Sequence, residues 1–375
     1  MPGGFRVGPS MMLPVPRHFP FDAAVSTQFG FPKIRDSADM ETDLQALLLK
    51  RNQELSPLAH EQTAISNLVC QVQSVLDTII VSPPSALDQY ALDEVRQVGS
   101  YKKGTMIRGK NVADIVVVFR TLPTPEAVKA LEEHVLDGLR KVPESQIGTH
   151  MLYDDGASFK ITHTATRAVV NVMVSTVHQN LHNLDPLFHV DPDAVKLHLK
   201  AVRHARWFEE NAHHSTVKVL VRLLKDVQSR FTGFSALTCW HLEVLSHFSV
   251  MNNPEHTILS LPVAFKRFFQ LLAAGLLLPG SVGIGDPCEN PKIRLQGALE
   301  PEEQDAVAQT AQDILRLLCH GEYYKVIGFD EKFNGIGDAL LKLKGGVVFQ
   351  PSEAVYDERS FETNGLLALT GQTTA

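Results

Sequence analysis

The residues that could do chemistry in this chain gather in one stretch, Gln97 to Phe119, which reads QVGSYKKGTMIRGKNVADIVVVF. The Gly99-Ser100 turn allows the backbone to approach a phosphate closely and offers a hydroxyl group there. Asp114 follows on an apolar run that is typical of a buried strand. Carboxylates two residues apart on a strand point to one face and together hold Mg²⁺, but the second position here is Val116. The stretch therefore predicts a phosphate site with a single carboxylate on its strand.

The Gly-Ser turn and the strand that carries Asp114 resemble the signature of nucleotidyltransferase-fold proteins, the polymerase-β-like superfamily. Transfer in that fold uses two metal ions held by three carboxylates, with the third carboxylate on a later strand. The candidate later strand, Ala168 to Val177, offers Asn171 and neither Asp nor Glu. We therefore expect no transferase turnover and no required cofactor, although Asp114 with phosphate oxygens could hold a nucleotide's Mg²⁺ weakly. The alternative is an active, template-free transferase that adds nucleotides to RNA with carboxylates not recognised here.

A lone buried carboxylate is costly. Asp114 therefore either faces a cleft at the end of its strand or accepts hydrogen bonds from the preceding loop. The loop before Asp114 carries four cations, Lys102, Lys103, Arg108 and Lys110. They could contact phosphate or could lie in a solvated charged loop, and the sequence favours neither. His213-His214 has no cysteine or carboxylate at ligand spacing, so it predicts no metal site.

Further cations lie on two predicted helices. Lys218 is in the first turns of STVKVLVRLLKDV, from which a lysine can reach a triphosphate across a cleft; a surface lysine is the alternative. Lys196, Lys200 and Arg203 share one face of the preceding helix. The favoured interpretation of that face is a solvated helix surface, and an RNA-facing stripe is the alternative.

The elements that position these residues change in character along the chain. Helices and β-branched strands alternate up to about residue 185, and Leu-rich helices follow. We expect a disordered Gly/Pro-rich tail over residues 1–35, an α/β lobe with a mixed sheet over 36–185, a helical lobe over 186–350 and a C-terminal tail over 351–375. The expected helices are 42–55, 61–81, 124–139, 193–211, 215–231, 235–250, 261–277 and 300–320. The expected strands are 94–98, 112–119, 148–153, 158–164, 168–177 and a short one from 347, with a turn at Asp154-Asp155-Gly156.

Composition narrows the function classes. The chain has 375 residues, 44% of them hydrophobic, and a net charge of −7, so any nucleic-acid contact must use a local basic face or a partner. The four cysteines are far apart, without a CxxC pair, which favours core packing over disulfides or zinc. Walker A, GxGxxG and GxSxG motifs are absent from the sequence. The sequence predicts a soluble intracellular protein without a signal peptide or membrane association.

Several longer stretches resemble, in the same order, the DZF domain (domain associated with zinc fingers). They are KRNQELSP, EVRQVGSYKKGTM, NVADIVV, RHARWFEENA, STVKVLVRLLKD, VMNNP and LAAGLLLPGSVGIGDPCE, and the match runs from about Leu47 to Gly321. The resemblance implies an inactive nucleotidyltransferase lobe followed by a helical lobe like that of the oligoadenylate synthetases. STVKVLVRLLKD is similar to the lysine-bearing helix of those synthetases, which implies that Lys218 contacts a triphosphate.

The same resemblance implies that the helical lobe forms a heterodimer with a larger DZF-domain protein that carries double-stranded-RNA-binding domains or zinc fingers. RNA would bind mainly through that partner. The implied role is nuclear RNA metabolism and transcriptional regulation, with the nucleus as the expected location and the cytoplasm as a second one.

The helix LPVAFKRFFQLLAAGLLLPG is apolar on more than one face, so it needs cover from two sides. We expect a core shared with the partner, with burial in the chain's own lobe as the alternative. The interface candidates are Phe265, Phe268, Phe269 and Leu272.

Overall fold

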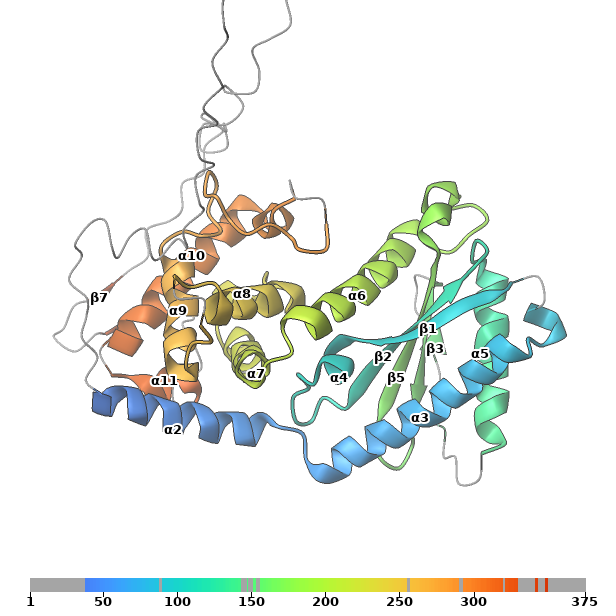
Figure 1. Ribbon diagram of the computed structural model, residues 1–375, viewed down its shortest axis with the longest axis horizontal. Coiled ribbons are helices and arrows are strands. Elements are labelled where there is room, and N and C mark those ends of the chain that lie inside the picture. The colour runs from blue at the N-terminus through green and yellow to red at the C-terminus, as the bar shows by residue number, and fades with distance from the viewer. Residues whose placement is uncertain are drawn as a thin grey trace, which may run out of the picture.

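The computed structural model describes residues 38–87, 90–142, 147, 151–152, 156–254, 257–289, 293–319, 321–329, 341–342 and 348–349. The tails expected at residues 1–35 and 351–375 lie outside the described residues, as does the Asp154-Asp155 pair. The described elements form a sheet lobe and a helical lobe, with the short helix α4 lying where they meet (Figure 1).

The sheet lobe is built on a mixed sheet in which the described strands follow the order β1-β2-β5-β4-β3. β2 and β5 are parallel, whereas the other neighbouring pairs are antiparallel. The mixed sheet predicted from the sequence is therefore confirmed. The strands are β1 (Leu92–Val98), β2 (Val112–Phe119), β3 (Met151–Leu152), β4 (Ser158–Thr162) and β5 (Val169–Thr176).

Strand β2 is covered on both faces, as its continuous apolar run predicts. Alternate residues such as Ile115 and Val117 belong to a core shared with α3 (Ala59–Val81) and α5 (Pro125–Arg140). Val116 and Val118 point the other way and pack with Ala205 of α6 (Pro192–Asn211). Helix α3 is long and apolar enough to cross a membrane by length and composition alone. Its apolar stripe packs in the core of the sheet lobe, which accounts for that composition.

The helical lobe surrounds one large hydrophobic core. Its helices are α2 (Ala38–Leu55), α7 (Ser215–Arg230), α8 (Cys239–Met251), α9 (Leu261–Ala273), α10 (Pro301–Cys319) and α11 (Tyr323–Ile327). The remaining elements are α4 (Gly99–Lys103), 3₁₀ turns at Ser85–Leu87, His178–Asn183, Thr232–Phe234 and Leu295–Ala298, and the antiparallel pair β6 (Leu341–Lys342) and β7 (Val348–Phe349).

The expected interface role of the α9 aromatic residues needs correction. Phe265, Phe268, Phe269 and Leu272 are each at most 1% exposed, inside the chain's own helical lobe. The Phe269 ring meets the rings of Phe265 and Phe268 edge to face, at 5.0 and 5.2 Å between centroids. The second cover that this apolar helix needs comes from its own lobe, so these four side chains present no surface to a partner.

The lobes are not divided at residue 185 as the composition predicts. Leu44 and Leu48 of α2 belong to the core of the helical lobe, although they precede the sheet in sequence. Helix α6 follows residue 185 but packs on β5 and β1. The composition along the chain predicts which helices and strands form, but it does not predict which hydrophobic core each of them packs in.

Candidate functional site

The Gly-Ser turn and Asp114 are brought together by strand register. Val98, the last residue of β1, pairs with Asp114 on β2, so Gly99 begins α4 directly beside the carboxylate. Gly99 has a φ of 68°, and a Cβ atom added there would lie 2.2 Å from Oδ2 of Asp114. Only glycine fits this close approach. The association of Gly99-Ser100 with Asp114 that the spacing predicts is present in the structure.

Asp114 is held from the neighbouring parallel strand. Asn171 is its register partner on β5, and the Asn171 Nδ2 amide donates a hydrogen bond of 2.8 Å to Asp114 Oδ1. The carboxylate therefore lines a cavity, as one of the two expectations has it, and its hydrogen bond comes from β5 and not from the preceding loop. Burial raises the pKa of Asp114, and this effect outweighs the Asn171 hydrogen bond and the nearby charges of Lys103 and Lys225.

Val116, which stands where a paired carboxylate would be expected, is fully buried. It shares the face of β2 that carries Asp114, but it packs with Val98, Val118 and Ala205 under α6. Asp114 thus lies at the open end of this face, and the next position along it lies in a closed apolar cluster.

A cavity of about 910 Å³ opens beside Asp114, between α3, the loop before β2, the β4–β5 turn and α7. Its volume is in the range of small-molecule sites. Cationic side chains contribute to its wall from three separate elements, because Lys110, Arg167 and Lys225 all line it. Ser100, Thr105 and Asn111 add polar groups. A cavity with this lining suits an anionic ligand with hydrogen-bonding groups.

The lysine of α7 that reaches this cavity is Lys225. Its ammonium group donates to Ser100 Oγ at 2.8 Å and to the Thr105 carbonyl and hydroxyl oxygens, each at 3.2 Å. Burial lowers the pKa of Lys225. Lys218, the residue singled out from the sequence, lies beside Gly104 and is not among the described residues that line the cavity. Lys225 is seven residues further along the same helix face, and that spacing is the signal that could have identified it.

The cations between Lys102 and Lys110, on α4 and the loop after it, have four different environments. Lys103 is buried and its Nζ lies 2.6 Å from Glu243 Oε2 on α8. Lys102 forms an exposed ion pair of 2.8 Å with Glu209. Lys110 lines the cavity, and Arg108 is exposed without being among the described lining residues. Helix α4 therefore links the lobes through Lys103, and the loop after it contributes Lys110 to the cavity wall.

The α6 stripe is paired with carboxylates of its own chain. Lys196 lies 3.0 Å from Asp193. Lys200 and Arg203 both approach Glu289, at 3.4 and 3.0 Å. These ion pairs reduce the positive potential that an RNA-facing surface would need.

Arg167 is a cavity residue that sequence reasoning missed. It lies in the turn between β4 and β5 with a φ of 56°, an uncommon backbone conformation for a residue other than glycine. Strained backbone of this kind concentrates at functional sites. Nothing in the run THTATRA predicts that conformation or places the turn at a cavity.

The raised pKa of Asp114 leads to a pH-dependent prediction for Asp114→Asn. Because the folded state holds this proton more tightly than the unfolded state does, the stability that Asp114 contributes is present below the unfolded pKa and lost as pH rises through the folded pKa. Relative to wild type, the variant is therefore expected to gain stability as pH rises from 3 to 8. Urea unfolding at several pH values measures this gain, and a difference in stability that stays constant with pH would contradict it.

Solved structures with a similar fold include CdnC of E. coli MS115-1, in a complex with HORMA-deltaN (TM-score 0.52) and with ATP (TM-score 0.53). In both cases the identity is 14%, covering 78% of this chain and 98% of that one. The Cid1 poly(U) polymerase matches with 11% identity and a TM-score of 0.50, covering 74% of this chain and 95% of its own. These likenesses show a nucleotidyltransferase-like fold with a helical lobe. Two family models match in sequence: the DZF N-terminal domain at residues 4–213 and the DZF C-terminal domain at 216–349.

Proposed function

The chain belongs to the DZF family, and from this premise we propose that it is a non-catalytic, nucleotidyltransferase-like subunit that pairs with a larger DZF-domain protein. It binds a nucleotide without turning it over, and it stabilises a partner that carries double-stranded-RNA-binding domains or zinc fingers. Its role is in nuclear RNA metabolism and transcriptional regulation.

The observation that carries the non-catalytic part is the environment of Asp114. A two-metal site needs carboxylate oxygens converging on both ions. Here one Asp114 oxygen accepts a hydrogen bond from the Asn171 amide, and the adjacent same-face residue is the buried Val116. This donor set does not fit two metal ions. The chain's own groups still favour phosphate, because Lys110, Arg167 and Lys225 line the cavity.

Lys225→Met is expected to weaken binding of a fluorescent ATP analogue at least tenfold, because the variant loses the buried ammonium that lies between Ser100 and Thr105. Lys218→Met, on the same helix but outside the described cavity lining, is the matched control and is expected to change the affinity less than twofold. Fluorescence anisotropy measures both dissociation constants. A larger loss of affinity in Lys218→Met than in Lys225→Met would mean that Lys218, the lysine predicted from the sequence, contacts the nucleotide.

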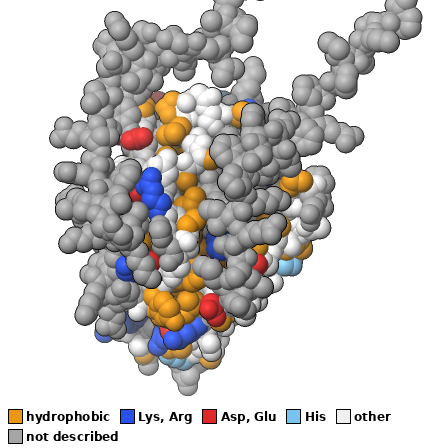
Figure 2. Space-filling view, turned by 90° about the vertical axis from the view of Figure 1, so that its left-hand side faces the viewer, with side chains coloured by type: hydrophobic (Ala, Val, Ile, Leu, Met, Phe, Trp, Pro, Cys, Tyr) orange, Lys and Arg blue, Asp and Glu red, His pale blue; other side chains and the backbone are white. Residues whose placement is uncertain are grey.

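Partner binding is supported by exposed apolar surface on the helical lobe. A shallow groove of about 450 Å³ runs between α9 and α10, lined in part by Ala273, Ala274 and Leu315. Val263 and Ile258, at the start of α9 and just before it, are exposed as well. Figure 2, viewed from the helical-lobe end, shows hydrophobic side chains gathered with charged ones around them, an arrangement typical of interaction surfaces.

The pairing is tested by co-expression with a larger DZF-domain protein and light scattering of the purified product. Wild type is expected to form a one-to-one complex, and Ala274→Glu in the groove is expected to weaken it at least tenfold. Ala91→Glu makes the same exchange at an exposed position of the sheet lobe and is expected to leave the complex intact. A stable wild-type monomer that does not bind the co-expressed protein would contradict the proposed pairing.

RNA affinity in this proposal belongs mainly to the partner. The net charge of −7 and the ion-paired state of Lys196, Lys200 and Arg203 both support that division. Binding of double-stranded RNA by the chain alone, at the affinity of the complex, would place the RNA site in this subunit instead.

A further inference from the structure

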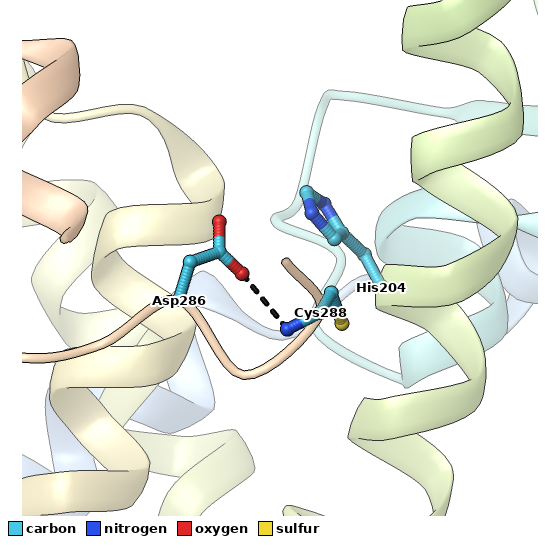
Figure 3. Close-up of side chains that lie close together, drawn as sticks. All are labelled: His204, Asp286 and Cys288. Carbon is cyan, nitrogen blue, oxygen red and sulfur yellow. Dashed lines mark hydrogen bonds between the residues drawn. The ribbon is translucent and has the colours of Figure 1, made fainter. Parts of the chain in front are cut away.

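Three potential metal ligands from two distant parts of the sequence meet where the two lobes join. Figure 3 shows the His204 ring projecting from α6 toward the loop that carries Asp286 and Cys288. One donor atom from each residue lies within 4.8 Å of the other two. Sequence spacing predicts no such site, because 82 positions separate His204 from Asp286 and the cysteine belongs to no CxxC pair.

The histidine ring is held in place by stacking. Its ring stacks on Trp240, with 3.6 Å between centroids and an interplanar angle of 4°. Among the described residues, nothing forms a hydrogen bond with its buried Nε2 atom. A buried polar atom without a partner is costly and calls for a ligand, ion or water.

The carboxylate is oriented by two donors. Asp286 Oδ1 accepts a hydrogen bond of 2.9 Å from the Cys288 backbone amide, and Oδ2 accepts one of 3.1 Å from the Trp240 indole. Outer contacts of this kind hold a metal-binding carboxylate in place. Trp240 therefore fixes two of the three donors at once, the imidazole by stacking and the carboxylate by hydrogen bonding.

We propose that His204, Asp286 and Cys288 bind a zinc ion, through an imidazole nitrogen, a carboxylate oxygen and the Sγ atom. A mixed nitrogen, oxygen and sulfur donor set suits zinc far better than magnesium or calcium. Water fills the fourth position, and the thiol releases its proton to solvent when the metal binds. Donors around tetrahedral zinc lie about 3.3–3.8 Å apart, so side-chain shifts of about 1 Å close the site.

The cations beside the site set its affinity. Lys200 Nζ lies 3.6 Å from Asp286 Oδ2 and 3.4 Å from Glu289 Oε1, while Arg203 pairs with Glu289 at 3.0 Å. Lys200 thus competes with the metal for Asp286, and it retains Glu289 as its counter-ion once zinc binds. Removing this charge strengthens binding, and Lys200→Met is expected to bind zinc several-fold more tightly.

The site would join the two lobes. Around His204, α6 packs on the sheet through Val202 and Ala205, whereas its C-terminal end, Trp240 and the loop before α10 belong to the helical lobe. A metal bound to both restrains their relative position and stabilises the folded state by mass action. This consequence is independent of whether the cavity beside Asp114 binds a nucleotide.

The test uses the full chain, stripped of metal by a chelator and titrated with Co²⁺, whose thiolate charge-transfer absorption reports a Co–S bond. We expect one saturable equivalent that Zn²⁺ displaces, and a melting temperature that rises with Zn²⁺. Cys288→Ser is expected to abolish the absorption, and His204→Ala to weaken binding at least tenfold. Cys319→Ser, at an exposed cysteine, is the control and is expected to match wild type.

Absence of the thiolate absorption in wild-type protein would overturn the proposal, whatever the variants do. So would Co²⁺ binding that persists unchanged in Cys288→Ser and His204→Ala, because it would arise from other histidines of the chain. Circular dichroism of each variant separates a lost ligand from a lost fold, and Asp286→Asn supplies a third ligand variant if either of the others does not fold.

Discussion

Glu243→Gln is expected to lower the free energy of unfolding by about 3–5 kcal/mol, because it leaves the Lys103 ammonium buried without its counter-ion. The two charges lie 2.6 Å apart, and their side chains are 7% and 2% exposed. The aromatic rings of Phe208 and Trp240, each within 6 Å of the Lys103 Nζ atom, attract the cation only weakly by comparison. Lys103 is in α4 and Glu243 in α8, so the loss would loosen the contact between the lobes.

Urea unfolding followed by circular dichroism measures this loss. Glu209→Gln is the matched control, because it removes the partner of the adjacent Lys102, whose ion pair is 2.8 Å long but exposed. Exposed pairs of this kind contribute about 0–1 kcal/mol. Equal losses in the two variants would mean that the Lys103–Glu243 pair is hydrated in solution and does not link the lobes.

Gly99→Ala is expected to lower the free energy of unfolding by about 2–5 kcal/mol. This loss combines the backbone strain of a left-handed alanine with an overpacked contact. At a φ of 68°, the new Cβ atom would lie 2.2 Å from Asp114 Oδ2, so the carboxylate must move out of its hydrogen bond with Asn171. Binding of the ATP analogue is expected to weaken together with stability, since Asp114 and Ser100 both line the cavity.

Gly109→Ala separates the two causes of that loss. Gly109 has a φ of 78°, but a Cβ atom there would meet nothing within 4 Å, so only the backbone strain of about 1 kcal/mol is expected. In the double variant Gly99→Ala, Asp114→Ala, the new Cβ atom no longer meets the Asp114 carboxylate. The part of the stability loss that comes from this steric contact should therefore be recovered. If the stability losses of the two single variants simply add in the double variant, the Asp114 carboxylate does not restrict the side chain at position 99.

The fold could be predicted well from the sequence where the apolar pattern is strong. The VADIVVVF run of β2 and the stripe of α3 both identify elements that the structure contains, because a short β-branched run is typical of a strand covered on both faces and three-to-four spacing follows from helix geometry. The short helix α4 was expected as a plain turn, because five residues carry no periodicity to recognise.

The candidate site could be predicted only in part, because it depends on which elements meet. Gly99, Asp114 and Asn171 lie on neighbouring strands, so a fold resemblance was enough to associate them. Lys225 and Arg167 reach the same cavity from α7 and from a strained turn. Their positions follow from the contact between the lobes, which no local pattern records. The same reason explains why the α9 aromatic residues were expected at an interface and belong to the chain's own core.

The central claim is that the cavity beside Asp114 binds nucleotide and does not transfer it. The most direct test incubates the purified chain with labelled nucleoside triphosphates, an RNA primer and either Mg²⁺ or Mn²⁺, at protein concentrations where the ATP analogue is bound. The account predicts that the primer is not extended and that no labelled product forms. Product that appears with the wild-type chain and disappears with Asp114→Ala would contradict it.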